Sequence, residues 1–464
     1  MNDYKTPGVY IEEIPNLPPS IASVETAIPA FIGYTQKAEL KEPGDLINQP
    51  KRIISMLEYE KYFGFAQPET SITVTIDTTQ PGIVVQGKAT APSNYLMYHS
   101  LQMFFINGGG PCYIVSVGDY AGGGVIDQAT LKAGLDEVAK INEVTLILFP
   151  DGLNMTDAGN YYALHKEALD QAADLKDRFV VMDVWKDDDD TVDNVEVLRD
   201  ADFGTIDTNK YGAVYYPRIF TRLDYSYDDE SAVEIVGTGD GSLSGTLAEL
   251  KDKNNAYYFM AKAAINDIEM IMPASSAVVG KYAEVDNSRG VWKAPANIGI
   301  DYAIRPEKLI THKEQENLNV DTTAGKSINV IRSFQGRGPA IIWGARTLAG
   351  NDNEWRYISV RRFFNLVEES TKNATQQFVF EPNDRNTWIR VKSMIENYLT
   401  QQWKAGALMG TTTREAYFVK VGLGETMTEV DVWEGRMIVE IGMAVVRPAE
   451  FIILRFMHKM LQET

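Results

Sequence analysis

The sequence contains little of what most catalytic and metal sites are built from, because its 464 residues include one cysteine and four histidines. The single cysteine, Cys112, excludes an intrachain disulfide and is typical of a protein made in a reducing compartment. The histidines are scattered, so no zinc-binding spacing occurs. We therefore expect neither a bound metal nor a cofactor.

Long hydrophobic runs are missing as well. The most apolar stretch, IGMAVVRPAEFIILRFM at 441–457, is interrupted by two arginines, a proline and a glutamate, so it does not resemble a membrane span. The first 25 residues contain four prolines and no apolar core of a signal peptide. These absences predict assembly in the cytoplasm without a signal peptide and no direct membrane insertion.

Positive charge is also scarce, since the formal net charge is −20. That balance argues against a nucleic acid partner. The charge is unevenly spread: residues 330–464 carry 17 basic and 15 acidic side chains, whereas the preceding part carries 27 and 49. We expect the nearly neutral C-terminal part to be enclosed and the acidic part to face water.

What is present is a series of short, continuously apolar runs that alternate with helical patterns. Such runs predict a parallel sheet covered by helices on both faces, in a three-layer α/β domain. The expected strands are 30–35, 112–117, 144–150, 178–184 and 213–217, and the expected helices are 54–64, 95–110, 128–140 and 157–176.

The remaining segments include two expected insertions, two helices and a strand-like C-terminal end. Residues 71–87 form a strand, a Pro-Gly turn and a second strand, and 219–250 is an acidic, glycine-rich surface insertion. A helix is expected over 255–272, and another over 385–405 with an apolar face. The end of the chain, 437–457, has strand-like composition.

The N-terminal stretch TPGVYIEEIPNLPPSI, residues 6–21, poses a question. Val9 to Ile14 has the pattern of a strand, but Pro15, Pro18 and Pro19 follow it. These prolines impose a stiff, extended exit, so no tight hairpin returns the chain to this strand. It pairs either with its own domain or with another molecule.

An enzymatic interpretation finds little support. Asp151, in PDG after an expected strand, stands where an acid of a subtilisin-like triad would be, but no serine elbow or suitably placed histidine accompanies it. The alternative is a turn at the strand end. AGKS at 324–327 is similar to the tail of a phosphate-binding loop, but Val320 occupies the position of a required glycine.

Several stretches resemble the contractile tail sheath family of phage tails, R-type pyocins and extracellular contractile injection systems. They extend from TPGVYIEEI near the start to IVEIGMAVVRPAEFIILRF near the end, and those from 273 onward are the most specific. The other matching stretches are FIGYT (31–35), FFINGGGPCYIVSV (104–117), PASSAVVGKYAEVDNSRGVWKAPAN (273–297), NVIRSFQGRGPAIIWGARTL (329–348), EWRYISVRRFFNLVEES (354–370) and FVFEPND (378–384).

The resemblance implies an α/β fold with a central three-layer subtilisin-like α/β domain without its active site. It also implies an α+β C-terminal domain and extended N- and C-terminal arms that form an inter-subunit β-sheet. The expected boundaries are 1–25 for the N-terminal arm, 26–320 for the central domain with insertions near 66–93 and 219–250, 321–448 for the C-terminal sheath domain and 449–464 for the C-terminal arm.

The function implied is a structural subunit that polymerises helically around an inner tube and contracts to drive that tube through a target envelope. The implied partners are further copies in stacked six-fold rings, the inner tube protein, baseplate and terminator or cap proteins, and paralogous sheath subunits. The particle would be a phage tail or a released extracellular phage tail-like particle. The alternatives are an α/β hydrolase-like enzyme and a monomeric binding protein.

Two groups of residues are candidates for assembly contacts. By resemblance, the inter-subunit strands contain Val9, Tyr10, Ile11, Glu12, Ile14, Phe451, Ile452, Ile453, Leu454 and Arg455. Because the C-terminal part is nearly neutral, helix 385–405 is a candidate for the tube-facing surface, through Arg385, Arg390, Lys392 and Lys404. The alternative is that these four are solvated charges on an ordinary amphipathic helix.

Overall fold

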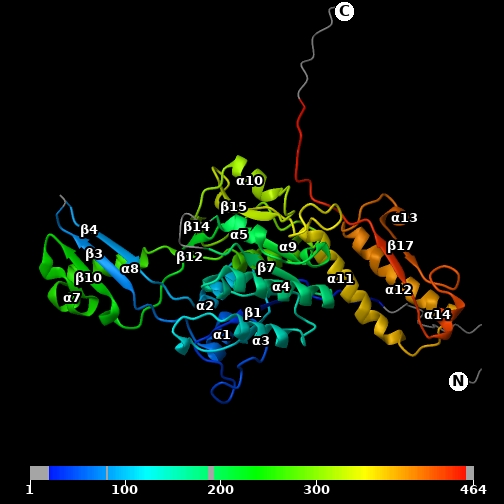
Figure 1. The fold of residues 1–464 in the computed structure, drawn as a ribbon, viewed down its shortest axis with the longest axis horizontal. Helices are drawn as coiled ribbons and strands as arrows, with labels where there is room; N and C mark the ends of the chain where they lie inside the picture. Colours follow the sequence, from blue (N-terminus) through cyan, green and yellow to red (C-terminus); the bar gives the residue numbers. More distant parts are fainter. Residues whose placement is uncertain (1–19, 80–81, 187–192, 456–464) are drawn as a thin grey trace, which may run out of the picture. The chain divides into compact units, whose positions relative to one another are not determined.

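The computed structural model describes residues 20–79, 82–186 and 193–455. The chain divides into two compact units, one of residues 25–366 with 447–464 and one of residues 1–24 with 367–446. Figure 1 shows the ribbon, with labels on many of the helices and strands. The expected N-terminal strand, Val9 to Ile14, lies outside the described residues.

The 25–366 unit is organised around a nine-stranded sheet. Neighbouring strands of its central part, from β15 to β5, run parallel, and the edge strands are antiparallel. In spatial order the strands are β13 (Ile298–Gly299), β16 (Gly338–Trp343), β15 (Ile328–Phe334), β8 (Gly212–Tyr216), β7 (Phe179–Asp183), β6 (Leu146–Leu148), β1 (Pro29–Gly33), β5 (Cys112–Ser116) and β2 (Lys51–Ile53). The five strands expected from the sequence are all present, as β1, β5, β6, β7 and β8.

Helices cover both faces of this sheet. Successive strand residues point to opposite faces, so each face presents apolar side chains that the helices bury. In β1, Ala30 and Ile32 enter one hydrophobic cluster while Phe31 enters the other. The first cluster is closed by α3 (Gln128–Val138), α4 (Ala158–Leu175), α5 (Asn194–Asp200) and α10 (His312–Asn319). The second is closed by α1 (Met56–Phe63), α2 (Met97–Ile106), α9 (Ser275–Arg289) and the start of α11 (Ile358–Thr375). The expected three layers are therefore observed.

The two expected insertions form one module. Strand β10 (Glu234–Thr238) pairs in parallel with β3 (Ile72–Asp77), so segments about 160 residues apart share a four-stranded sheet. The order is β11 (Gly245–Thr246), β10, β3 and β4 (Val84–Ala89), with α7 (Leu247–Lys253) and α8 (Asn255–Asn266) against it. Its core contains Ile72, Val74, Ile76, Val233 and Ile235.

Three expectations need correction. The helix expected over 255–272 ends at Asn266, and Met270–Met272 forms β12, which pairs with β9 (Ile219–Thr221) beside β14 (Ala303–Pro306). In the described part of the strand-like end, residues 437–455, the one named strand is β18 (Glu440–Met443). The domain boundary expected at 320/321 falls instead at 366/367, because β15 continues the main sheet beside β8 and β16 follows it.

The second unit combines helices with a small sheet. Its α12 (Arg385–Lys404) buries Val391, Ile395, Tyr398 and Leu399, as the apolar pattern predicted, and leaves Trp388 half-buried. Strand β17 (Tyr417–Lys420) pairs antiparallel with β18, and the remaining elements are the end of α11, α13 (Thr413–Ala416) and α14 (Glu429–Trp433). Ser23 and Val24 also belong here, through hydrogen bonds with Tyr398 and Ser370.

Candidate functional site

Asp151 serves the fold rather than a reaction. Its fully buried carboxylate accepts hydrogen bonds from the backbone amides of Tyr34 (2.7 Å), Leu96 (2.5 Å) and Met97 (3.1 Å). Leu96 and Met97 begin α2, which has no side-chain cap of its own. The carboxylate therefore satisfies amides that a helix start leaves without partners. Burial raises the pKa of Asp151 to about 7, although these hydrogen bonds act in the opposite direction.

Asp183 repeats this arrangement one strand further along the sheet. Its carboxylate, at the end of β7, accepts hydrogen bonds from the amides of Ala274 (2.9 Å) and Ser275 (3.1 Å), at the start of α9. Burial raises its pKa to about 6. The acid after one strand and the acid at the end of the next therefore each cap a helix, and those two helices lie on the same face.

The two buried histidines are also packed as core residues. His165 contacts the rings of Phe149 and Tyr161, and its Nδ1 lies 2.9 Å from the carbonyl of Tyr161. Burial lowers the pKa of both His165 and His99 to about 4, so both rings are neutral at physiological pH. Neither is bonded to Asp151 in a triad, whose carboxylate is directed at backbone amides.

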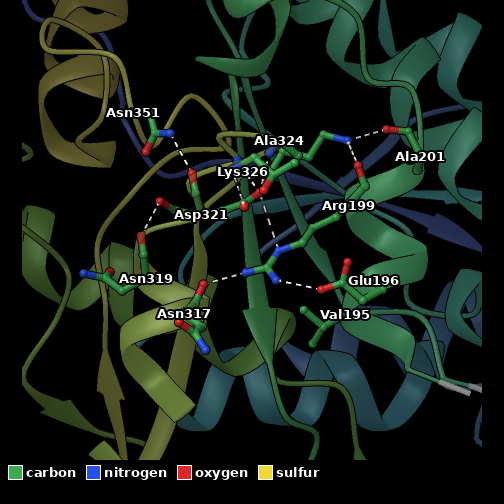
Figure 2. A network of polar contacts seen from close by, with 12 residues as sticks. Val195, Glu196, Arg199, Ala201, Asn317, Asn319, Asp321, Ala324, Lys326 and Asn351 are labelled. Atoms are coloured by element: carbon green, nitrogen blue, oxygen red, sulfur yellow. Dashed lines mark hydrogen bonds and ion pairs between the residues drawn. The ribbon is translucent and has the colours of Figure 1, made fainter. Parts of the chain in front are cut away.

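In the AGKS segment the backbone amides are hydrogen-bonded to a side chain of the same loop, so they are not available to bind a phosphate. The carboxylate of Asp321 accepts hydrogen bonds from the amides of Thr323, Ala324 and Lys326, the groups that would otherwise bind an anion. The ammonium of Lys326 donates to the carbonyls of Arg199 and Ala201 at the C-terminal end of α5 (Figure 2). Arg199 lies 3.5 Å from Asp321, so the loop is neutralised internally.

The described residues contain neither a metal-binding cluster nor a membrane-spanning helix. Within 20–79, 82–186 and 193–455, no group of three His, Cys, Asp or Glu side chains is placed to hold a metal ion. Across those ranges, none of the helices combines the length and apolar character needed to span a bilayer.

The C-terminal segment leaves its unit abruptly after Glu450. The side chain of Glu450 is 19% exposed and accepts hydrogen bonds from Arg346, Asn319 and Tyr357. The next side chains are almost free of protein contact, with exposed fractions of 70% for Phe451, 79% for Ile452, 78% for Ile453 and 72% for Leu454. These residues and Arg455 have no secondary structure in the isolated chain.

The small sheet of the other unit has open edges. β17 and β18 pair only with each other as named strands, so in the described residues neither has a second strand partner. An isolated two-stranded sheet is only marginally stable, and an open edge is a template for another strand. Phe418 on β17 is 49% exposed.

The four charged candidates on α12 do not share one face. Arg385, Arg390 and Lys404 are exposed, whereas Lys392 is half-buried. At 3.6 residues per turn, Arg390 and Lys404 lie within about 40° of each other, while Lys392 lies about 160° away from Arg390. Arg390 also lies 3.7 Å from Glu381.

Sequence reasoning missed Glu450 and Arg346. The only local signal is that Glu450 is the single acid of the run 441–457, two residues after Pro448. Its partner lies 104 residues earlier, and no local pattern connects the two.

Comparison with known proteins identifies the class. Residues 350–458 match the family model of the phage tail sheath C-terminal domain. The tail sheath protein of Vibrio phage KVP40 is 27% identical over 135 residues, which is 29% of this chain and 20% of that protein. That of Enterobacteria phage T4 is 24% identical over 158 residues, 34% of this chain and 23% of that protein. The chain thus matches between a fifth and a quarter of the length of these two relatives.

Solved structures match over the whole chain. The helical sheath of the anti-feeding prophage in its contracted state is 31% identical, with a TM-score of 0.66, and the match covers 98% of this chain and 100% of that one. The sheath complex of an extracellular contractile injection system, PVC, also contracted, is 28% identical with a TM-score of 0.64 and 99% coverage of both chains. The chain belongs to the contractile tail sheath family. It is a structural sheath subunit, and its relatives give no indication of catalysis.

Proposed function

We propose that this chain polymerises helically around an inner tube and contracts to drive the tube through a target envelope. The observation that carries the proposal is the end-to-end likeness to a contracted sheath, at 31% identity and a TM-score of 0.66. The self-capped Asp151 and the self-neutralised 321–326 loop support a structural role over the hydrolase alternative.

The proposed architecture keeps a subtilisin-like central domain without its active site. Its boundaries follow the compact unit 25–366 rather than residue 320. The second unit, which contains residues 367–446, is the C-terminal sheath domain, and residues 1–24 and 447–464 supply the arms. The insertion module is proposed to face outward, where additional polar sequence disturbs no packing.

The arms are proposed to dock as strands on neighbouring subunits. Five consecutive residues, 451–455, are exposed without a partner, and four of them are large and apolar. Such a segment gains backbone hydrogen bonds and burial when it adds to an open sheet edge. The edges of β17 and β18 are the proposed acceptors for the C-terminal arm and for the N-terminal strand with Val9, Tyr10, Ile11, Glu12 and Ile14.

A non-closing chain of such exchanges generates a helical polymer. The proposed partners are further copies in stacked six-fold rings, an inner tube protein, baseplate and terminator proteins, and paralogous subunits. A structure of the related anti-feeding prophage baseplate contains a chain that is 31% identical to this one, which supports a baseplate contact. Assembly is proposed to occur in the cytoplasm, before release as a phage tail or tail-like particle.

Negative-stain electron microscopy of the purified full chain tests the proposal. Rods or tubes of constant diameter are expected above a critical concentration, with or without the inner tube. Dispersed particles at every concentration, in the presence of the tube protein of the same particle, would contradict it.

A further inference from the structure

The start of the C-terminal segment is held by an ion pair between Glu450 and Arg346, which no local sequence pattern predicts. Glu450 accepts hydrogen bonds from Arg346, from Nε at 2.9 and 3.2 Å and from Nη2 at 2.6 Å. This is the two-pronged geometry in which a guanidinium binds a carboxylate most specifically. Asn319 at 2.9 Å and Tyr357 at 3.3 Å add two further donors.

Arg346 is itself fixed to the main sheet. Its side chain is 4% exposed, and Nη1 donates to the carbonyls of Asn319 and Gly350 at 3.3 Å. Its backbone amide and carbonyl both bond to the side chain of Asn329 in β15, at 2.8 Å each. Asn329 also donates to the carbonyl of Val214 in β8. A continuous series of hydrogen bonds therefore leads from Glu450 to the middle of the sheet.

The charge state of Glu450 fits this role. Burial acts to raise the pKa of Glu450, but hydrogen bonds from Arg346 and Asn319 and the charge of Arg346 outweigh it and hold the pKa below its ordinary value. The carboxylate therefore stays ionised, and the pair stays intact, at neutral pH.

We infer that Glu450 and Arg346 form a clamp that fixes where the C-terminal arm leaves the 25–366 unit and so sets the free length of the arm. This inference rests on the proposed function, because it assigns positioning residues to the arm exchange. Without the clamp, the nearest upstream attachment in the described residues is Arg447, whose Nη1 donates to the carbonyl of Asn353 at 2.8 Å. Residues 448–450 would then add about 10–11 Å of slack.

Slack weakens docking by lowering the effective concentration of the arm at its acceptor. That concentration falls as about the −3/2 power of tether length, so doubling the free residues costs about threefold. The added slack also loosens the mechanical link between a docked arm and the sheet of its own subunit. The clamp thus matters both for polymer formation and for passing rotation from one subunit to the next.

The first experiment measures, in the unassembled full chain, how tightly the clamp fixes the start of the C-terminal arm. Spin labels at Phe451→Cys and His312→Cys report the distance between the arm root and α10, and His312 has an 86% exposed side chain. Cys112 is fully buried and burial raises its pKa, so it does not compete for label. Glu450→Gln is expected to broaden a narrow distance distribution, while Glu450→Asp, which keeps the charge, restores part of it.

The matched control is Glu354→Gln, which neutralises an exposed carboxylate close in sequence to Tyr357. A distribution for Glu450→Gln that matches the control would overturn the clamp. Circular dichroism confirms that both variants are folded, and Arg346→Lys, which keeps charge but loses the fork, gives the same broadening if Glu450→Gln fails to fold.

The second experiment measures polymerisation of the unlabelled variants by sedimentation. Glu450→Gln is expected to raise the critical concentration by up to about threefold, and Glu354→Gln to leave it unchanged. Equal critical concentrations would overturn the role in assembly. If the unmodified chain forms no sheath, the proposed function fails, whereas the distance measurement still decides whether the clamp exists.

Discussion

Asp151 and Asp183 hold a carboxylate at the start of a helix that lies far away in the sequence. Each comes from the end of a parallel strand, and each accepts hydrogen bonds from the first amides of α2 or α9. Gly33 makes the first of these contacts feasible, since a side chain there would collide with the Asp151 carboxylate. Both acids therefore join a strand of the sheet to a helix of the layer that covers it.

Replacing Asp151 with Asn tests that structural role. At pH 5 the Asp151 carboxyl of the folded chain is largely protonated and carries one O–H donor, whereas an Asn amide brings two N–H donors toward the three backbone amide donors. We expect the free energy of unfolding to fall by about 1–3 kcal/mol at pH 5, measured by denaturant titration of the unassembled chain. The control Asp136→Asn removes an exposed carboxylate and should change it by less than about 0.5 kcal/mol. Equal stability of the two variants would contradict the capping role.

The buried acids also predict an unusual pH dependence. Burial raises the pKa of Asp151 to about 7 and that of Asp183 to about 6, from an ordinary 3.8. Between about pH 4 and 7 the folded chain therefore keeps protons that the unfolded chain has released. These two groups make the free energy of unfolding fall as pH rises through that window.

The difference between wild type and Asp151→Asn isolates this contribution from other charges. We expect the advantage of wild type to be largest near pH 5 and to shrink by pH 8, in unfolding titrations at both values. An advantage that grows with pH would mean that the three amides outweigh burial and that the pKa lies below its ordinary value.

At the level of elements, the insertion module is one cooperative piece made of two distant segments. Its central strands β3 and β10 come from different segments, pair side by side, and contribute apolar residues to one shared core. Removal of 225–245 alone would take away β10 and expose Ile72, Val74 and Ile76. The same sequence that looks like a dispensable loop therefore contains half of a core.

Joint removal is the appropriate experiment. Replacing 72–89 by a short linker is feasible because the amide of Thr90 bonds to the carbonyl of Ser71, and 228–266 is replaced at the same time. We expect the double replacement to stay folded and to form tubes, whereas the replacement of 225–245 alone aggregates, as judged by size-exclusion chromatography and electron microscopy. Tubes from the partial but not the joint variant would show that the module provides a lattice contact.

For deletion of the C-terminal arm we expect unchanged stability of the unassembled chain but loss of polymerisation. Deleting 451–464 removes side chains that are 70–79% exposed between Phe451 and Leu454, so the melting temperature of the unassembled chain should stay within about 2 °C. Polymerisation should be lost, because the exchanged strand is gone. A truncated chain that still forms normal tubes would end the strand-exchange proposal for this arm.

The sequence predicted the elements that depend on local pattern and failed where contacts are distant. The central strands were found because parallel strands covered on both faces are continuously apolar. By contrast, β12 is only three residues long, so it was absorbed into the preceding helix. The boundary was placed too early because β15 joins β8 across more than 100 residues. The Glu450–Arg346 pair was missed for the same reason.

At the scale of the whole molecule, function depends on what the isolated chain leaves incomplete. One unit has buried acids that cap helices of the same unit, and the other has a two-stranded sheet whose strands have no further strand partner in the described residues. An exposed apolar arm begins at a fixed point on the first unit. In the proposed assembly, strand exchange with neighbouring subunits would complete these parts and link the units of successive subunits.

The contact with the inner tube is the remaining part of the proposed assembly, and α12 gives a sharp test of it. Arg390 and Lys404 lie on one side of the helix within about 40°, whereas Lys392 lies about 160° from Arg390. If the exposed side faces an acidic tube surface, Arg390→Glu with Lys404→Glu should reduce co-sedimentation of sheath with tubes and leave the unassembled chain folded. Lys392→Glu is the matched control and should have little effect.

Moderate salt should weaken the wild-type contact in the same way, because exposed charge pairs are screened beyond about 8–10 Å at physiological ionic strength. Co-sedimentation is measured at low and high salt for all three proteins, and the salt dependence should disappear in the double variant. If the double variant binds tubes like wild type at both salt concentrations, these charges are ordinary solvated side chains. If only Lys392→Glu abolishes binding, the opposite side of α12 faces the tube.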